Sequence, residues 1–260
     1  MKIKNVIFDY GGTLDTGGTH WADIIYNAYR RHAILISEED FKKAYIIAEK
    51  ALTLYHLVKP TDTFKMVLFT KIRIQLEWMH DHGHIPMSTP QMKTLHKEIV
   101  EELYAFARQH TSNALRVITA LKTSGINVAL VSNFYGNLRT VLREMGLFES
   151  FDCIIESAEV GIRKPDPRIY ALAGERMGVR EGEESSVVVV GDSLQKDILP
   201  ASSLGFQTVW IRSAVAASSG IFSRKAAPSA EASATHTISC IQQLLPLIGT
   251  STNHPAAKAT

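Results

Sequence analysis

The stretch Val6-Ile7-Phe8-Asp9-Tyr10-Gly11-Gly12-Thr13-Leu14-Asp15 decides how the rest of this chain is interpreted. Three apolar residues run without polar alternation into an aspartate, which is typical of a buried strand that ends at a functional site. The glycine at residue 12 lets the chain turn tightly after that strand. Residue 11 is also a glycine, at a place where a second carboxylate would be more useful chemically.

Four more apolar runs of this kind lie further along the chain. Together with Lys2–Phe8 they are Asn127–Val131, Asp152–Ile155, Val187–Val190 and Gln207–Ile211. Helical patterns lie between them, at Asn137–Met145 before Gly146 and at Pro167–Met177, which follows Asp166 as a helix cap and ends before Gly178. Strands that alternate with helices predict an α/β fold with a Rossmann-like, doubly wound parallel sheet.

Residues 20 to about 110 instead show helical periodicity without a strand pattern. Apolar side chains recur there at steps of three or four residues, and Pro60, Pro86 and Pro90 mark the breaks. The three series are Phe41, Ala44, Tyr45, Ala48, Leu52 and Tyr55; Phe64, Val67, Leu68, Ile72, Leu76 and Met79; and Met92, Leu95, Ile99, Leu103 and Phe106. We therefore predict a bundle-like helical insertion after the first strand.

These patterns predict a discontinuous α/β core domain of residues 1–16 and 111–249 and a helical domain of residues 17–110. Within the core, Ser213–Thr235 is rich in Ala and Ser and is expected to be a surface loop. A last short strand at Thr237–Ser239 and a closing helix at Ile241–Ile248 follow, and residues 250–260 are expected to be a frayed tail.

Composition limits the classes of function. The net charge of +2 does not favour nucleic acid or an anionic membrane as the main partner. No apolar stretch approaches the ~18 residues of a membrane span, and the first residues do not resemble a signal peptide. Cys153 and Cys240 are far apart and form no CxxC, which favours a reducing compartment. We expect a cytoplasmic protein, and its oligomeric state is left open.

Three of the apolar runs end in a polar residue of catalytic type. The first ends at Asp9, the run Asn127–Val131 ends at Ser132, and the four valines from residue 187 end at Gly191-Asp192-Ser193. In open α/β sheets, ligands bind outside the carboxyl ends of the strands. If these three strands are parallel neighbours, Asp9, Ser132 and Asp192 converge on one spot.

Asp9, Asp192 and Asp197 would place three carboxylates in one small site, where like charges cost several kcal/mol unless a cation is present. The chain has no His/Cys cluster with zinc spacing, and carboxylates with water suit Mg²⁺, which favours phosphate. Lys164 supplies a second positive charge, and the prolines of the loop Gly161–Pro167 suggest that it is held in place.

Four motifs then occur in a characteristic order. They are Asp9-Tyr10-Gly11-Gly12-Thr13, Ser132-Asn133, Lys164-Pro165, and Gly191-Asp192-Ser193-Leu194-Gln195-Lys196-Asp197. In this order the chain resembles the haloacid dehalogenase superfamily, over the whole α/β part. The helical insertion between the first two motifs is similar to that family's mobile α-helical cap.

The resemblance implies a hydrolase and a set of roles. Asp9 would be the nucleophile that attacks phosphorus and forms an aspartyl-phosphate. The Asp9 carboxylate, the backbone carbonyl of Gly11 and Asp192 would hold Mg²⁺. Ser132, the Asn133 amide and Lys164 would bind the transferring phosphoryl oxygens. The residues expected to support the site are Thr13, Ser193 and Asp197, the last by orienting Lys164 or the waters of the metal.

Gly11 departs from the pattern of the family's phosphatases, where a second aspartate acts as general acid and then as general base. Such help is typically worth ~10²–10⁴ in rate, and glycine cannot give it. The metal site would survive, because its contact at this position is a main-chain oxygen. A phosphatase with another proton donor remains the main interpretation, and Asp15, His20 and a metal-bound water are candidates for that donor.

Three alternatives stay open. A 2-haloacid dehalogenase also lacks the second aspartate, but those enzymes typically carry an aromatic residue at that position and need no magnesium, whereas the metal motif Gly191-Asp192-Ser193 is intact here. A phosphonoacetaldehyde-type hydrolase would recruit a lysine of the insertion as a Schiff base, and the candidates are Lys42, Lys43, Lys50, Lys65 and Lys71. The third alternative is a relative that binds a phosphorylated ligand or a protein partner with little or no turnover. The substrate expected for the main interpretation is a small phosphorylated metabolite, because a closing cap excludes large ones.

Overall fold

The computed structural model describes residues 2–213, 221 and 234–249. Most of the predicted loop Ser213–Thr235 and the whole of the predicted tail, residues 250–260, lie outside these residues. Among the described residues, no helix is both long enough and apolar enough to span a bilayer. The cytoplasmic location stays a prediction.

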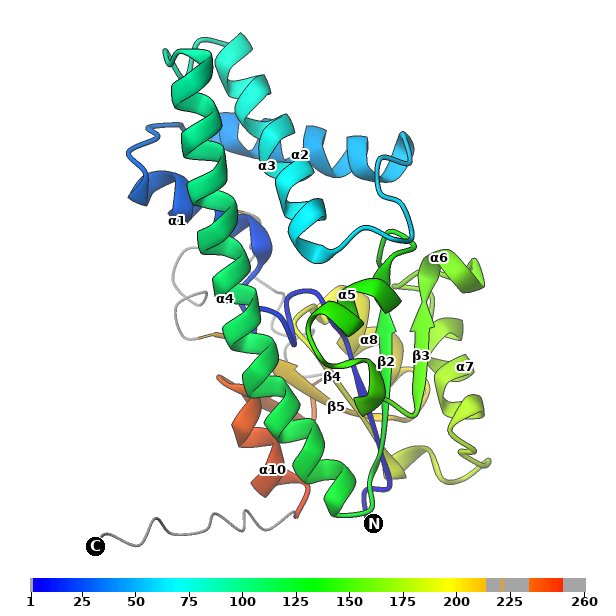
Figure 1. Ribbon diagram of the computed structural model, residues 1–260. Helices are drawn as coiled ribbons and strands as arrows, with labels where there is room; N and C mark the ends of the chain where they lie inside the picture. The colour runs from blue at the N-terminus through cyan, green and yellow to red at the C-terminus, as the bar shows by residue number, and fades with distance from the viewer. Residues whose placement is uncertain (1, 214–220, 222–233, 250–260) are drawn as a thin grey trace, which may run out of the picture.

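A parallel six-stranded sheet forms the lower part of the molecule, with β1 near its centre (Figure 1). The strand order is β3-β2-β1-β4-β5-β6. The bounds are β1 Asn5–Phe8, β2 Asn127–Ser132, β3 Cys153–Glu156, β4 Val187–Gly191, β5 Gln207–Ile211 and β6 His236–Ile238. Each predicted strand is present, with ends displaced by up to three residues, and the predicted α/β fold class with a doubly wound sheet is confirmed.

The apolar runs lack polar alternation because both faces of the sheet are covered. Val6, Phe8 and Leu130 belong to one core cluster, while Ile7 and Val131, one residue out of phase with them, belong to a second cluster. Successive side chains of a strand point to opposite faces, so a strand buried on both faces needs apolar residues throughout.

Short helices connect the strands. They are α5 Leu138–Glu144, η1 Phe148–Ser150, α6 Ser157–Val160, α7 Arg168–Arg176, η2 Glu184–Ser186, the π-helical turn η3 Leu194–Ile198, α8 Leu199–Ser202, η4 Ile241–Gln243 and α10 Leu244–Leu247. The helix predicted at Pro167–Met177 begins one residue later, at Arg168, and the Asp166 carboxylate accepts the Arg168 N–H at 3.0 Å. Asp166 therefore still satisfies a donor of the first turn.

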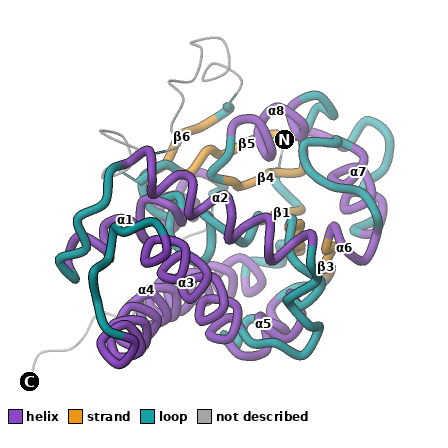
Figure 2. The backbone as a smooth tube through the Cα atoms, turned by 90° about the horizontal axis from the view of Figure 1, so that it is seen from above, coloured by secondary structure: helices purple, strands orange, loops and turns teal. Residues whose placement is uncertain are grey.

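Residues 21–110 form the predicted helical segment, which lies over the carboxyl edge of the sheet (Figures 1 and 2). It contains α1 Trp21–Arg31, α2 Glu38–Leu54, α3 Phe64–Asp81 and the first part of α4 Thr89–Thr123. Side chains of Ser37 and Thr63 accept backbone N–H groups at the starts of α2 and α3, and Ser88 and Gln91 form a capping box at α4. Tyr55 departs from its predicted apolar series: α2 ends at Leu54, and Tyr55 is 73% exposed.

The helix α4 is continuous over 35 residues and belongs to both parts of the molecule. Its first half packs against α1 and α3, and its second half packs against β2 and α10 (Figure 1). The predicted boundary between residues 110 and 111 falls inside this helix. The division into two domains therefore stays a prediction.

Candidate active site

Asp9 lies directly after the central strand β1 and is almost fully buried, at 4% exposure. Its N–H donates to the carbonyl of Val190 at 2.9 Å, which continues the pairing of β1 with β4. The Thr13 hydroxyl donates to Asp9 Oδ2 at 2.9 Å, and Lys164 Nζ donates to Asp9 Oδ1 at 2.5 Å. Both carboxylate oxygens are thereby fixed at the carboxyl edge of the sheet.

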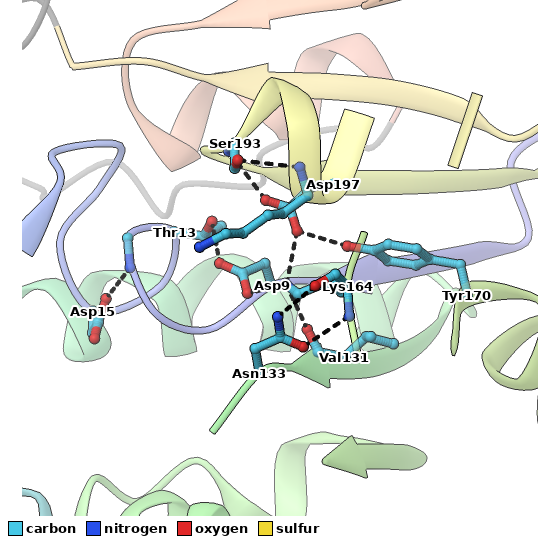
Figure 3. Close-up of polar contacts among 11 residues, drawn as sticks. Asp9, Thr13, Asp15, Val131, Asn133, Lys164, Tyr170, Ser193 and Asp197 are labelled. Carbon is cyan, nitrogen blue, oxygen red and sulfur yellow. Dashed lines mark hydrogen bonds and ion pairs between the residues drawn. The ribbon is translucent and has the colours of Figure 1, made fainter. Parts of the chain in front are cut away.

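Lys164 bridges two of the predicted site acids (Figure 3). Besides Asp9, its Nζ donates to Asp197 Oδ1 at 2.7 Å and to the Val131 carbonyl at 3.2 Å. The side chain of Asn133 fixes the backbone of Lys164, because Oδ1 accepts the Lys164 N–H and Nδ2 donates to the Lys164 carbonyl, both at 2.9 Å. The side chain of Asn133 thus holds the backbone of the loop that carries Lys164.

Besides Lys164, two further groups of the protein hold the Asp197 carboxylate. Tyr170 OH donates to its Oδ1 at 2.8 Å, and the Ser193 N–H donates to its Oδ2 at 3.1 Å. Tyr170 was not among the predicted site residues, since it fits the apolar face of α7. A buried tyrosine hydroxyl needs a polar partner, but the sequence does not show which group that partner is.

Asp192, the remaining predicted acid, completes a cluster of three carboxylates. Asp9, Asp192 and Asp197 each have an oxygen within 4.8 Å of the others. Glycine is required beside them: a Cβ on Gly12 would lie 2.4 Å from Asp192 Oδ2, and one on Gly191 would lie 2.4 Å from Asp197 Cβ. The backbone at Gly12 is therefore in close contact with Asp192, and the backbone at Gly191 is in close contact with Asp197.

Burial dominates the ionisation of these groups. It raises the pKa of Asp9 to about 6 against the opposing charge of Lys164, and it raises the pKa of Asp192 well above its usual value, with Asp9 and Asp197 adding to the effect. Burial alone would lower the pKa of Lys164, but the charges of Asp197 and Asp9 outweigh it and hold that pKa raised. One lysine thus faces three acids, and the cluster fits a divalent cation that would supply the missing positive charge.

Ser132 is the last residue of β2 and is 2% exposed. The register pairs Phe8 with Leu130 and with Val190. The residues that end or follow these strands, Asp9, Ser132 and Asp192, therefore lie at the same edge of the sheet. The structure thus brings Asp9 and Asp192 together and places Ser132 at the same edge of the sheet, and the role of Ser132 stays a prediction.

The sequence profile of the haloacid dehalogenase-like hydrolases matches residues 3–205 of this chain. The chain belongs to that family. It is similar to haloacid dehalogenase-like hydrolase domain-containing protein 3 of Danio rerio, with 41% identity over 97 residues, which is 37% of this chain and 38% of the relative.

Two further relatives differ in the activity that their names give. A phosphoserine phosphatase of Thermus thermophilus is 32% identical over 118 residues, 44% of this chain and 46% of its own length. The (S)-2-haloacid dehalogenase 1 of Pseudomonas sp. strain CBS-3 is 40% identical over 102 residues, 38% of this chain and 42% of its own. The chain thus spans less than half the length of these curated relatives.

Solved structures share the fold over nearly the whole length. The HAD-hydrolase YfnB from Bacillus subtilis, bound to magnesium, has a TM-score of 0.57 at 17% identity and covers 96% of this chain and 100% of its own. A dehalogenase in an intermediate complex has a TM-score of 0.55 at 20% identity and covers 95% of this chain and 97% of its own. At these identities the likeness concerns the fold alone.

The two candidate proton donors of this haloacid dehalogenase-like hydrolase occupy different environments. Asp15 is fully buried, and its oxygens accept the Gly12 N–H at 2.7 Å and the Trp21 indole N–H at 2.8 Å. It lies apart from the Asp9–Lys164–Asp197 contacts (Figure 3), and burial raises its pKa to about 7. His20 is the N-cap of α1, and burial, followed by the charge of Lys196, lowers its pKa to about 4.

Gly11 is exposed at the turn after Asp9. A Cβ built on it would meet no atom within 4 Å, and its φ is not in the left-handed region that favours glycine. The fold of this family member therefore does not require glycine at residue 11, unlike at Gly12.

Proposed function

We propose that this chain is a magnesium-dependent phosphatase of small phosphate monoesters that transfers the phosphoryl group to Asp9. The observation that carries the proposal is the meeting of three carboxylates with a single lysine at the end of β1. Attack on carbon, as in dehalogenation, needs no divalent cation, so the third carboxylate would only add repulsion there. A phosphoryl group and a divalent cation together use all of these charges.

Asp9 and Asp192 would hold the ion through their side chains, and Gly11 would do so through its main-chain oxygen. Mg²⁺ bound there would neutralise charge on the phosphoryl oxygens and so favour attack by an anionic nucleophile. Asp197 is less available as a ligand, because Lys164, Tyr170 and the Ser193 N–H already bind its oxygens. Its proposed role is to position Lys164.

The reaction proceeds in two displacements. An Asp9 oxygen forms a bond to phosphorus while the bond from phosphorus to the leaving oxygen breaks, and the leaving oxygen takes up a proton. Water then attacks phosphorus and the bond from Asp9 to phosphorus breaks, so that hydrogen phosphate leaves with one proton of the water, while the other proton passes to solvent and replaces the one that the leaving oxygen took up. Thr13 holds one Asp9 oxygen in place, and Lys164, Ser132 and the Asn133 main-chain N–H stabilise charge on the transferring oxygens.

Neither protein candidate is well suited to protonate the leaving oxygen. Both oxygens of Asp15 are bound inside the loop, and His20, with its pKa near 4, is a poor proton donor at neutral pH. The proposed substrates are therefore esters whose leaving oxygen needs little protonation. The helical segment would act as a cap that limits the size of the substrate and excludes water.

A Schiff-base mechanism fits the structure less well. Of the five lysines considered for it, Lys71 is the one that is buried, and it pairs with Glu49 at 2.6 Å. Burial would lower the pKa of Lys71, but the charge of Glu49 reverses the effect and raises it. An amine that attacks a carbonyl has to be neutral, so this lysine is poorly suited to that role.

The test is hydrolysis of 4-nitrophenyl phosphate with Mg²⁺ by the full chain and by Asp9→Asn. We expect the wild-type chain to release phosphate, and we expect Asp9→Asn to lower kcat by a factor on the order of 10⁴ or more, because the nucleophile is lost. Asp166→Asn is the matched control, since Asp166 pairs with Arg168 in an exposed loop and should keep activity.

Chloride release from 2-chloropropionate without phosphate release would overturn the proposal in favour of dehalogenation. Binding of Mg²⁺ and phosphate without turnover of any phosphate ester would overturn it in favour of a non-catalytic relative.

A further inference from the structure

A second buried lysine lies in the helical segment. Lys71 of α3 is 8% exposed, and its Nζ donates to Glu49 Oε1 at 2.6 Å and to Tyr135 OH at 3.3 Å. Tyr135 OH donates in turn to Glu49 Oε2 at 2.8 Å. The ammonium group also lies 5.7 Å from the ring centroids of Tyr45 and Tyr135. An ammonium group has three donor hydrogens, and its two hydrogen bonds here use two of them.

This Lys71 cluster, defined as Lys71, Glu49, Tyr45 and Tyr135, joins the helical segment to the active-site edge of the sheet. Tyr135 is its one member from the α/β part, and it follows Asn133 by two residues in the loop after β2. The α2 and α3 helices, which carry the other members, lie across that edge (Figure 2). A leaving group that extends from a phosphoryl group at Asp9 toward the helical segment would therefore meet the Lys71 cluster.

His20 shows how close these charges are to the fourth motif. Lys196, Glu49 and Lys71 all act on its pKa, the two lysines lowering it and the glutamate raising it. Lys196 directly precedes Asp197, whereas Lys71 and Glu49 lie in the helical segment. The His20 ring also lies 6.2 Å from the ring of Tyr45, a member of the Lys71 cluster, so charges from both parts of the molecule lie near His20.

The charges of these three side chains near His20 do not cancel. Lys71 and Lys196 carry two positive charges, and Glu49 carries one negative charge. At Asp9, by contrast, three carboxylates would be balanced by Lys164 and one divalent cation. Among the three side chains near His20, Lys71 is the cation that the helical segment supplies, on the side toward which a leaving group would extend.

We propose that Lys71 determines specificity by binding a second anionic group on the leaving group, so that the preferred substrates are phosphate monoesters that carry a carboxylate or another phosphate. This inference rests on the proposed phosphatase function and specifies its substrate class. Glu49 and Tyr135 position the Lys71 ammonium, and Glu49 weakens its attraction for an anion. Lys71 and the anion then form a charge-assisted hydrogen bond in a buried place.

The test compares two aryl phosphates that differ in one charge. 3-Carboxyphenyl phosphate and 3-carbamoylphenyl phosphate have nearly the same shape, and only the first carries a second anion. We expect wild-type kcat/KM to be about tenfold or more higher for the carboxylate, as for a hydrogen bond to a charged group. Glucose 1-phosphate and glucose 1,6-bisphosphate form a second pair that distinguishes a phosphate from a carboxylate as the anion.

Three variants separate recognition from a structural effect. Lys71→Met is expected to remove the preference while kcat/KM for the carbamoyl ester changes little. Glu49→Gln is expected to increase the preference, because the opposing negative charge is gone. Lys65→Met is the matched control, since Lys65 also lies on α3, with Glu101 at 2.7 Å and the Tyr104 ring at 5.3 Å, but is more exposed.

Equal kcat/KM for the two esters in the wild-type chain would overturn the inference and leave the phosphatase proposal intact. Equal losses for both esters in Lys71→Met, together with no gain in Glu49→Gln, would also overturn it. Hydrolysis of no ester by the wild-type chain would overturn the proposed function and this inference with it.

Discussion

Two buried lysines, Lys164 at the edge of the sheet and Lys71 in the helical segment, have similar electrostatics and different surroundings. Their side chains are 3% and 10% exposed, and in both cases carboxylates raise a pKa that burial alone would lower. Lys164 lies between Asp9 at the end of β1 and Asp197 in the turn η3, whereas Lys71 has one acid and two tyrosine rings. The comparison suggests that the first lysine serves the phosphoryl group common to all substrates and the second serves the part that differs among them.

The largest expected effect comes from removing the sheet-edge lysine. Lys164→Met would leave Asp9 and Asp197 buried beside each other without their cation, and we expect a loss of about 3–5 kcal/mol in the free energy of unfolding. Chemical denaturation in metal-free buffer measures it. Lys4→Met is the control, because its ion pair with Glu183 is exposed and is expected to contribute less than about 1 kcal/mol.

If Lys164→Met and Lys4→Met lower the free energy of unfolding by the same small amount, Lys164 is not needed to stabilise the buried carboxylates of Asp9 and Asp197. The comparison between the two buried lysines would then lose its basis.

The next effect concerns the loop that leads from the sheet into the helical segment. Burial raises the pKa of Asp15 from 3.8 to about 7. The folded state therefore holds a proton that the unfolded state releases. The resulting stabilisation is complete below about pH 3.8 and is lost as the pH rises through about 7.

We expect the wild-type chain to lose on the order of 3 kcal/mol more than Asp15→Asn between pH 4 and pH 8. Denaturation midpoints of both proteins across this range in metal-free buffer measure the difference, and contributions from other titrating groups cancel. Parallel pH profiles would show that Asp15 is ionised in the folded chain throughout and that the loop is stabilised without a bound proton.

The smallest expected effect adds a group instead of removing one. Gly11→Asp has room for its side chain, and we expect it to raise kcat/KM about tenfold or more for alkyl phosphates, whose leaving oxygen needs a proton. The change for 4-nitrophenyl phosphate should be small. Gly11→Asn is the control of equal size that cannot act as an acid. A well-folded Gly11→Asp that gains nothing over Gly11→Asn would refute this account of residue 11.

The sheet-edge site could be predicted in large part from the sequence. Continuous apolar runs identify strands buried on both faces, and the residues that end them, Asp9, Ser132 and Asp192, share one edge because the strands are parallel. Lys164 was found because Pro165 and Pro167, which follow it closely, restrict its loop. Tyr170 was missed, because a tyrosine on the buried face of a helix looks the same whether its hydroxyl binds an acid or not.

The Lys71 cluster could not be predicted in the same way. Lys71 is one of the five lysines of the helical segment that were considered as candidates, and helical periodicity alone does not show which of them is buried. Its partner Tyr135 is 64 residues away in the chain and comes from a loop of the α/β part. Contacts of this kind depend on how the helices cross the sheet, which one-dimensional patterns do not determine. The course of α4 through the predicted domain boundary was missed for the same reason.

The continuity of α4 also has a mechanical consequence. At 35 residues the helix is about 50 Å long, and from Gln91 to Thr123 it contains no proline or glycine at which a sharp kink would form. The helix α4 is therefore stiff and belongs to both halves of the molecule. If the helical segment tilts relative to the sheet, α4 has to accommodate the movement by a slight curvature along its whole length. The backbone torsion that accompanies such a tilt would fall on the other connection between the two halves, the loop from β1 to α1. In that loop Gly17 and Gly18 have φ angles of 65° and 90°.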